Sequence, residues 1–319
     1  MKTLADIKKI AVLGAGTMGP GIAQTYAMGG YEVTMWTRSE STREKALLSL
    51  RSQLDTFEEE GLLRESKETI LSRISFALTV EEAVAGADFI QETIVEKKDA
   101  KVALYEQLAA CVPADVIIAS NTSALNIFEI VPPQLLPQQI ICHWYAPPHV
   151  IPLVEVVKSE EAPQEYADIA VTMLNNCGKT AVLMKKFIKG YIVNRLQQCL
   201  NQEVFYLLDN GYCDAEAIDL ASKASFIPRA CVLGLCKRMD FGGVDMTYNN
   251  FKNKSYAAPQ WENPPSTLEN LVSEGSLGIK SGKGFYDYEG VDMEELKAKR
   301  DKQLFEVFRL QQQFLDDPV

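Results

Sequence analysis

The sequence predicts an α/β protein, with a mainly parallel β-sheet in an N-terminal domain and an all-α C-terminal domain. Short apolar runs, typical of buried strands, alternate with helical patterns over the first part of the chain. Such alternation indicates crossover units and a parallel sheet. After Lys189-Gly190 only helical patterns recur. We therefore expect a sheet domain over residues 1–187 and a helical domain over residues 188–319.

The first strand runs directly into a glycine-rich turn, and a helical pattern follows it. Gly14 permits the tight turn, Gly16 lets the backbone approach phosphate groups, and Gly19 lets the helix pack closely on the strand. The free N–H groups and the positive end of the helix then face an anion. The pattern predicts a Rossmann-like dinucleotide site, and the alternative is a glycine turn without a ligand. The residues expected at this site are Gly14, Gly16, Thr17, Met18 and Gly19.

The second strand, Val33 to Trp36, ends without the acidic residue that binds the adenosine ribose in most NAD sites. It continues as Thr37, Arg38 and Ser39, which offer hydroxyls and a guanidinium to a 2′-phosphate. This composition favours NADP over NAD. The alternative is that Arg38 is a solvated surface residue and that Glu40 turns back to reach the ribose.

The remaining elements follow from periodicity and from glycine or proline breaks. Strands are expected at Ile74–Ala77, Phe89–Thr93, Val116–Ser120, Ile140–Cys142, Leu153–Val157 and Thr180–Met184. Helices are expected over Ser41–Leu71 with a break at Gly61, and over Val80–Ala87, Asp99–Ala110 and Gln164–Cys177. In the helical domain the clearest helices are Asn194–Leu208, Ala215–Lys223 and Met293–Phe314.

Charge and hydropathy limit the classes of partner. The formal net charge of −11 argues against a nucleic acid or an anionic membrane surface, because both require a basic face. No stretch approaches the ~20 apolar residues of a membrane span, and no signal-peptide pattern precedes the first strand. We therefore expect a cytoplasmic protein with a small-molecule substrate.

Cysteine and histidine usage gives no indication of a metal centre. The seven cysteines form no Cys-x-x-Cys pair, and several lie in apolar runs, where cysteine behaves as a small hydrophobic residue. Only His143 and His149 could accompany them. A histidine-based zinc site is therefore not expected.

Several motifs in order along the chain resemble the 3-hydroxyacyl-CoA dehydrogenase family, and the resemblance covers nearly the whole sequence. Besides the glycine turn, they are Ser120-Asn121-Thr122-Ser123, Cys142-His143-Trp144-Tyr145, Leu153-Val154-Glu155, Gly190 to Arg195, and Leu277 to Tyr286. The resemblance implies a Rossmann-like domain and a helical domain that forms a homodimer. It also implies oxidoreduction of a 3-hydroxyacyl thioester with a nicotinamide cofactor.

Four residues suit the chemistry of alcohol oxidation. Loss of hydride requires a base for the hydroxyl proton, and the imidazole of His143 is suited to neutral pH. Glu155 can bind the far imidazole nitrogen and stabilise the imidazolium. Ser123 and Asn194 can hydrogen-bond the reacting oxygen. The alternatives are a histidine satisfied within the core, and helix-capping roles for Ser123 and Asn194.

The resemblance also implies further contacts to the cofactor. Glu96 and Lys101 match the family's contacts on the nicotinamide ribose side, Lys280 matches another contact, and Asn121 is expected at the same site. The alternative for the charged residues is ordinary solvation.

Departures from the family pattern leave the substrate open. Ala146 stands where the family usually has Asn, and Trp144 with Tyr145 would make that wall of the site more aromatic. The run Glu58-Glu59-Glu60 repels a polyphosphate, whereas Lys45 and Arg51 on the same helix would attract one. Arg229 could bind a substrate carboxylate or phosphate, or could be a surface charge.

Three hypotheses remain at this point. The first is a dehydrogenase of 3-hydroxyacyl thioesters. The second is the same chemistry on a small free 3-hydroxy acid, as in relatives similar to gulonate dehydrogenase. The third is a non-enzymatic cofactor-binding protein, comparable to the lens crystallin relatives of this family.

Overall fold

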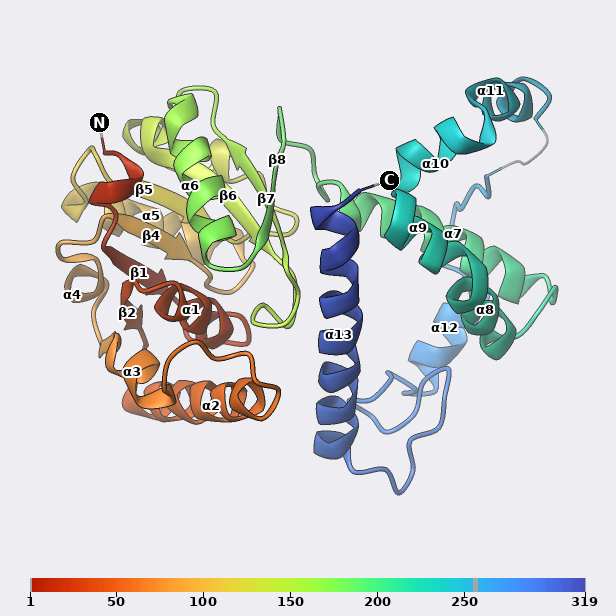
Figure 1. Cartoon of the computed structure of the whole chain (residues 1–319), viewed down its shortest axis with the longest axis horizontal. Helices are drawn as coiled ribbons and strands as arrows, with labels where there is room; N and C mark the ends of the chain where they lie inside the picture. Colours follow the sequence, from red (N-terminus) through yellow and green to blue (C-terminus); the bar gives the residue numbers. More distant parts are fainter. Residues whose placement is uncertain (1, 255–257, 319) are drawn as a thin grey trace. The chain divides into compact units, whose positions relative to one another are not determined.

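The computed structural model describes residues 2–254 and 258–318 and divides the chain into two compact units, Met1–Ile192 and Val193–Val319 (Figure 1). This boundary follows residue 192, whereas we expected it after residue 187. Tyr191 is only 1% exposed, because its ring packs in the core of the first unit beside Phe187. The segment that we assigned to the helical domain therefore begins as part of the sheet unit.

One sheet organises the first unit, and in the described residues it has eight strands in the order β3-β2-β1-β4-β5-β6-β7-β8. All neighbours pair in parallel except β6 and β7, which are antiparallel. The expectation of a mainly parallel sheet is confirmed. The strands are β1 (Lys9–Leu13), β2 (Glu32–Trp36), β3 (Ile74–Ala77), β4 (Phe89–Glu92), β5 (Ile117–Ser120), β6 (Gln139–Trp144), β7 (Leu153–Lys158) and β8 (Thr180–Leu183).

Helices cover both faces of this sheet and complete the Rossmann-like architecture (Figure 1). The α-helices are α1 (Gly19–Met28), α2 (Glu40–Glu59), α3 (Lys67–Ser72), α4 (Val80–Val84), α5 (Lys98–Cys111) and α6 (Gln164–Asn176). Three short 3-10 helices are η1 (Leu4–Asp6), η2 (Ile127–Glu129) and η3 (Pro133–Gln138). The break expected within Ser41–Leu71 separates α2 from α3.

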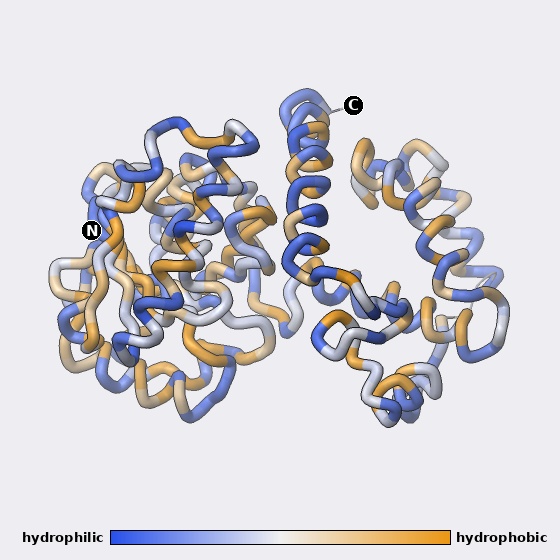
Figure 2. Tube along the Cα trace, turned by 90° about the horizontal axis from the view of Figure 1, so that it is seen from below, coloured by the Kyte–Doolittle hydropathy of each residue, from blue (hydrophilic) through white to orange (hydrophobic). Residues whose placement is uncertain are grey.

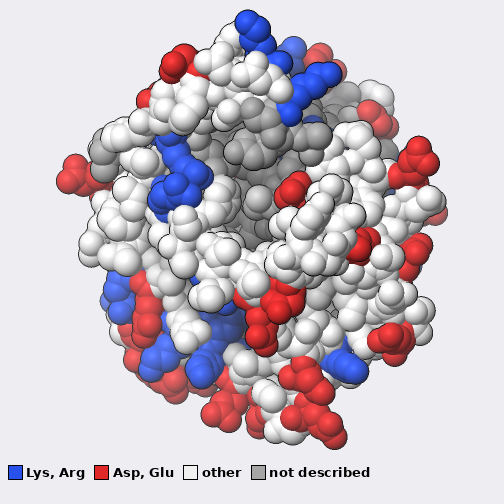
Figure 3. All heavy atoms as spheres, turned by 90° about the vertical axis from the view of Figure 1, so that its right-hand side faces the viewer, with Lys and Arg blue, Asp and Glu red and all other residues white. Residues whose placement is uncertain are grey.

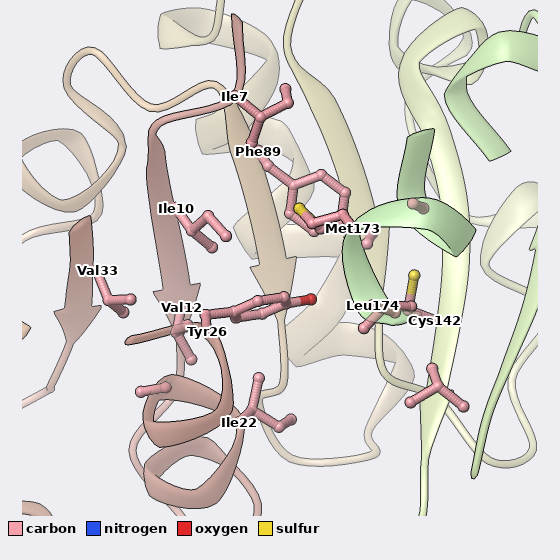
Figure 4. Packing of buried hydrophobic residues seen from close by; sticks show 14 of the residues in the cluster. Ile7, Ile10, Val12, Ile22, Tyr26, Val33, Phe89, Cys142, Met173 and Leu174 are labelled. Atoms are coloured by element: carbon pink, nitrogen blue, oxygen red, sulfur yellow. The ribbon is translucent and has the colours of Figure 1, made fainter. Parts of the chain in front are cut away.

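The core has two layers because successive side chains of a strand point to opposite faces. Ile10 and Val12 of β1 pack beside Tyr26 of α1 in one layer (Figure 4). Ala11 and Leu13 of the same strand lie in the other layer, which α4 and α5 cover. Burial on both faces explains why the strand sequences are continuous apolar runs rather than alternating ones.

In the described residues of the second unit the regular secondary structure consists of helices, joined by loops that include isolated bridges in the segment 278–287. Its helices are α7 (Val193–Asp209), α8 (Ala215–Ala221), the π-helical turn η4 (Ser222–Phe226), α9 (Ile227–Leu233), α10 (Leu235–Gly242), α11 (Val244–Lys252), α12 (Ser266–Ser273) and α13 (Met293–Asp316). Apolar residues recur along these helices between polar ones (Figure 2). Many of them are exposed, including Phe251 at 83% and Leu220 at 70%.

Among the described residues, no helix is both long and apolar enough to cross a membrane.

Candidate active site

The parallel strands bring the predicted site residues to one edge of the sheet. β1, β4, β5 and β6 are consecutive neighbours with the same direction, so their carboxyl ends meet at a shared edge. The glycine turn follows β1, Glu96 follows β4, and Ser123 follows β5. The carboxyl edge beside a change in strand order is where open α/β sheets bind their ligands.

The glycine turn has the geometry that a dinucleotide needs. Gly14 has φ +118°, and a Cβ there would lie 2.7 Å from the carbonyl oxygen of Thr93. A Cβ on Gly19 would lie 2.0 Å from the carbonyl oxygen of Gly14. A Cβ on Gly16, in contrast, would meet no atom within 4 Å. Gly14 and Gly19 are therefore required by the fold, whereas Gly16 keeps open a space into which a pyrophosphate fits.

The expected adenosine end of the site is arranged around the start of α2. Arg38 is exposed, whereas Thr37 is only 1% exposed and its hydroxyl is enclosed rather than offered to a ligand. Ser39 is the N-cap of α2, with its hydroxyl accepting from the amide of Thr42 at 3.2 Å. The carboxylate of Glu40 pairs with Arg43 at 3.1 Å. Of the three side chains expected to bind a 2′-phosphate, Thr37 is buried and Ser39 caps the helix, whereas the Arg38 guanidinium is exposed.

His143 and Glu155 face each other across two antiparallel strands. They are directly opposite in the β6–β7 register, and His143 Nδ1 lies 3.0 Å from Glu155 Oε2. A carboxylate only accepts hydrogen bonds, so Nδ1 carries a proton, which leaves Nε2 as the acceptor whenever the ring is neutral. Both residues are at most 2% exposed. The proline-containing bend after β6 returns the chain as expected.

Hydrogen bonds hold the Glu155 carboxylate through both of its oxygens. Oε2 accepts from His143 and from the Tyr145 hydroxyl at 2.7 Å, and Oε1 accepts from the amide of Ile192 at 2.9 Å. Both oxygens are thereby fixed, which orients the imidazole.

Ser123 lies on the other side of the imidazole. Its Oγ is 3.3 Å from His143 Nε2, and the residue is exposed. The three side chains of Glu155, His143 and Ser123 therefore form a continuous relay that leads outward from the sheet. Such a relay can move a proton between a buried carboxylate-supported imidazole and a bound hydroxyl.

Two tyrosines make contacts at this site that were not predicted, although Tyr145 was expected to line its wall. Tyr145 lies two residues after His143, and residues spaced by two share a face of a strand, which is the signal that would have placed its hydroxyl near Glu155. Trp144 lies between them on the opposite face and is buried, with its indole N–H donating to Gln91 Oε1 at 3.2 Å. The expectation that Trp144 lines the site was therefore wrong.

Tyr191 is the second tyrosine, and it has a left-handed backbone with φ 50°. Its ring stacks on His143 with centroids 4.3 Å apart, and its hydroxyl donates to the carbonyl oxygen of Thr122 at 2.6 Å. Burial, followed by the charges of Glu96 and Glu155, raises the pKa of Tyr191, so its hydroxyl stays a donor. No sequence pattern indicated this contact.

Lys179 is a further buried residue that sequence reasoning missed. Its Nζ donates to the carbonyl oxygens of Pro148 at 2.5 Å and Ile151 at 3.1 Å, in the bend between β6 and β7. Burial lowers the pKa of Lys179 to about 7. The amine thus stabilises, through these two hydrogen bonds, the bend that joins the strands of His143 and Glu155.

The residues expected on the nicotinamide side are tied into the protein. Lys101 is 0% exposed, with Nζ 2.7 Å from both carboxylate oxygens of Glu92. Glu96 keeps 34% of its side chain exposed. Asn121 Oδ1 accepts from the amide of Trp144 at 3.0 Å. Lys101 therefore has no surface to present to a ligand, in contrast to the contact that the resemblance implied.

The other predicted residues belong to the second unit. Asn194 is half-buried in the first turn of α7, and Arg229 is exposed on α9, where its Nε donates to the carbonyl oxygen of Ser225 at 3.1 Å. Lys280 is exposed and lines a cavity of about 580 Å³, whose other walls include Leu208 and Phe285.

The fold and this site together define a nicotinamide-dependent oxidoreductase. The sequence matches the NAD binding domain of 3-hydroxyacyl-CoA dehydrogenase over residues 9–187 and the C-terminal domain of the same enzyme over residues 190–288. The chain belongs to the 3-hydroxyacyl-CoA dehydrogenase family.

Individual relatives span nearly the full chain. A probable 3-hydroxybutyryl-CoA dehydrogenase from Bacillus subtilis (strain 168) is 35% identical over 89% of this chain and 98% of its own length. A 5-formyl-3-hydroxy-2-methylpyridine 4-carboxylate 5-dehydrogenase from Mesorhizobium japonicum is 30% identical over 95% and 98% of the two chains.

A solved structure of a dehydrogenase of that second kind, described as an NAD+ dependent dismutase, superposes on this chain with a TM-score of 0.85. The superposition covers 96% of this chain and 99% of that chain at 26% identity.

Proposed function

We propose that the protein interconverts a 3-hydroxyacyl thioester and its 3-oxo form, with His143 and Glu155 as the acid–base pair. The observation that carries this proposal is the Glu155–His143–Ser123 relay, in which His143 lies 3.0 Å from the Glu155 carboxylate and 3.3 Å from the Ser123 hydroxyl. The strands that lead to this relay and to the glycine turn belong to one sheet. The similarity to a probable 3-hydroxybutyryl-CoA dehydrogenase supports the substrate class.

In the oxidation direction the substrate hydroxyl loses its proton to His143 Nε2, and Glu155 stabilises the imidazolium that forms. A bound nicotinamide would supply the acceptor for the hydride that leaves the carbon bearing this hydroxyl. In reduction His143 returns the proton to the new hydroxyl. Ser123 and Asn194 are proposed to hydrogen-bond the reacting oxygen, and Arg229 is proposed to bind an anionic part of the substrate.

A second candidate is the same reaction on a small free acid. Lys67, the first residue of α3, pairs with Asp55 and Glu58 of α2 at 2.6 and 2.9 Å. Glu59 of α2 is left exposed. This acidic surface opposes a CoA polyphosphate, although Lys45 and Arg51 are exposed on the same helix. The relative that acts on a pyridine carboxylate supports this candidate.

The deciding experiment compares acetoacetyl-CoA with free acetoacetate while oxidation of NADPH or NADH is followed by absorbance. Turnover of the thioester supports the main proposal, and turnover of the free acid alone supports the second candidate. Cofactor binding by fluorescence titration without turnover of either compound would contradict both substrate assignments.

The cofactor is proposed to be NADP rather than NAD. Arg38 is exposed at the N-terminus of α2, and Glu40 is paired with Arg43 rather than turned toward the ribose position. A guanidinium beside a helix N-terminus suits a 2′-phosphate. Thr17, Met18, Asn121 and Lys280 remain proposed members of the cofactor site.

Arg38→Asp tests this assignment. Because a carboxylate repels a 2′-phosphate and accepts from ribose hydroxyls, we expect the Kd for NADPH to rise by ~10- to 100-fold while that for NADH changes little or falls. Fluorescence titration of both nucleotides measures it, with Arg43→Asp as a control on the same helix. An unchanged Kd for NADPH would show that Arg38 does not bind the phosphate.

We propose a homodimer that forms through the second unit. Most atoms in view on the face in Figure 3 belong to uncharged residues, and charged groups lie mainly around them. Exposed Phe241, Tyr248 and Phe251 on α10 and α11 supply apolar area that a second copy would cover.

A cytoplasmic location is also proposed, since the seven cysteines, all in described residues, form no disulfide.

A further inference from the structure

Glu96 binds the loop that carries Ser123 through a single carboxylate oxygen. Oε1 accepts from the amides of Ser123 at 3.0 Å, Ala124 at 2.9 Å and Leu125 at 3.2 Å. It also accepts from the hydroxyl of Thr122 at 2.5 Å. One carboxylate oxygen of Glu96, which follows β4, thereby holds four consecutive residues of the loop that follows β5.

The loop has no regular secondary structure to satisfy these amides, although the amide of Leu125 also donates to Thr122 Oγ1 at 3.2 Å. Burial raises the pKa of Glu96, but the bonds from Thr122 and the loop amides, together with the charge of Lys101, outweigh it and lower the pKa. Glu96 is therefore an anion at neutral pH, and each bond that it accepts is charge-assisted.

A fully buried ion pair, Lys101 with Glu92, lies next to the other carboxylate oxygen of Glu96. Lys101 Nζ lies 3.5 Å from Glu96 Oε2 and is held by both oxygens of Glu92 at 2.7 Å. Glu92 also accepts from the hydroxyl of Ser120 at 2.5 Å, at the end of the strand that leads into the Ser123 loop. The lysine thus links two carboxylates that bind the two ends of the same segment.

We infer that Glu96 is a positioning residue for Ser123, and that Lys101 acts on Ser123 through Glu96 instead of contacting the cofactor. The Ser123 hydroxyl lies 3.3 Å from His143 Nε2, a distance that depends on where the loop is held. This inference rests on the proposed function only for its kinetic consequence. The anchoring of the loop can be measured without turnover.

The structural test compares amide hydrogen exchange of residues 122–125 in the parent, in Glu96→Ala and in Lys101→Met. We expect exchange in this loop to become at least ~10-fold faster in Glu96→Ala and to increase in the same direction in Lys101→Met. Glu129→Ala is the matched control, because Glu129 accepts from Asn126 just beyond the loop and from none of its amides. Unchanged exchange in Glu96→Ala would overturn the inference, whatever the enzyme turns over.

The kinetic test is a double-mutant cycle with Ser123→Ala. We expect Glu96→Ala to lower kcat by ~10- to 100-fold in the parent but by less than ~3-fold when Ser123 is already alanine. Glu96→Gln, which keeps an acceptor oxygen, should restore most of the loss. The Kd for the cofactor should stay within ~3-fold throughout.

A role in cofactor binding gives a different pattern. Equal losses in both backgrounds, together with a rise in the cofactor Kd that matches them, would overturn the inference. If the parent protein turns over neither substrate, the proposed function fails, and the exchange experiment still decides the positioning role. If Glu96→Ala does not fold, Lys101→Met provides the exchange comparison, and unchanged exchange in that variant would overturn the inference.

Discussion

At the scale of single residues, the imidazole of His143 is held at both ring nitrogens and on one ring face. Glu155 binds one nitrogen, Ser123 contacts the other, and Tyr191 stacks on the ring face. The left-handed backbone of Tyr191 is unfavourable for a residue with a side chain, so the stacking and the bond to Thr122 must stabilise it. Such restraint orients the base before a substrate arrives.

The proposed acid–base roles predict a specific kinetic change. His143→Gln and Glu155→Gln should each lower kcat by ~10²- to 10⁴-fold, because proton transfer loses its base or its support. The cofactor Kd, measured by fluorescence titration, should change little. His149→Gln is the control, since it alters the only other histidine of the chain. Loss of cofactor binding in parallel with turnover would contradict these roles.

Lys179 predicts a pH dependence of stability. Its pKa is lowered by burial to about 7 in the folded protein, while the unfolded side chain keeps the ordinary value of 10.5. Between these values the unfolded state binds more protons, so this residue favours folding increasingly as pH rises, by at most about 1.4 kcal/mol per pH unit. Below about pH 7 both states are protonated and the dependence disappears.

Lys179→Met removes this titration. We therefore expect the difference in unfolding free energy, parent minus variant, to increase between pH 7 and 10 and to be constant below pH 7. Urea unfolding at several pH values measures it. A difference that is independent of pH across this range would show that the buried amine does not titrate there.

At the scale of elements, Gly19 and Gly16 serve different purposes in the glycine turn: the first allows close packing and the second leaves room for a ligand. Gly19 is limited by the backbone of Gly14, whereas the space beside Gly16 is open. The same chemical change, an added methyl group, should therefore affect folding at one position and ligand binding at the other.

We expect Gly19→Ala to lower the unfolding free energy by ~1–3 kcal/mol through overpacking against Gly14. Gly16→Ala should leave stability nearly unchanged and raise the cofactor Kd at least ~10-fold, because its Cβ would occupy the space for the pyrophosphate. Urea unfolding and fluorescence titration on both variants measure the two quantities. A stable Gly19→Ala, or a Gly16→Ala that binds normally, would contradict this division.

Most elements of the sheet unit could be predicted because buried strands leave apolar runs and helices leave a distinct period. The contacts of Tyr191 and Lys179 could not, because their partners are 69 and between 28 and 31 residues away and follow only from the packed fold. Trp144 was assigned to the wrong face, although strand alternation from His143 would have placed it in the core. Helices α9 to α12 were not predicted, since their short apolar patterns are interrupted by Pro228, Gly234 and Gly243.

At the scale of the whole molecule, the second unit has apolar helix surfaces that its own chain leaves exposed. α7, α8, α10, α11 and α12 contain no buried residue among those described. Small helical units gain stability when such faces are covered, which is why assembly belongs to the behaviour of the full chain.

We therefore expect the purified protein to sediment as a dimer, and the double variant Phe241→Glu/Phe251→Glu to sediment as a monomer. Introducing charges at two residues that are 65% and 83% exposed should oppose apolar contact between copies while disturbing each copy little. Analytical ultracentrifugation over a range of concentrations measures this. Leu48→Glu, on α2 of the first unit, is the control and should remain dimeric. A parent that is monomeric at every concentration would contradict the proposal.

The pairing of His143 with Glu155 in one β6–β7 register has a consequence for how such proteins diversify. The pair that we propose to handle the proton is encoded by a short continuous stretch within a single hairpin of the sheet unit. Arg229, which we propose to bind an anionic part of the substrate, is encoded after the boundary at Ile192. Mutation around Arg229 can therefore change which hydroxyl compound is accepted while the inherited acid–base pair is left intact.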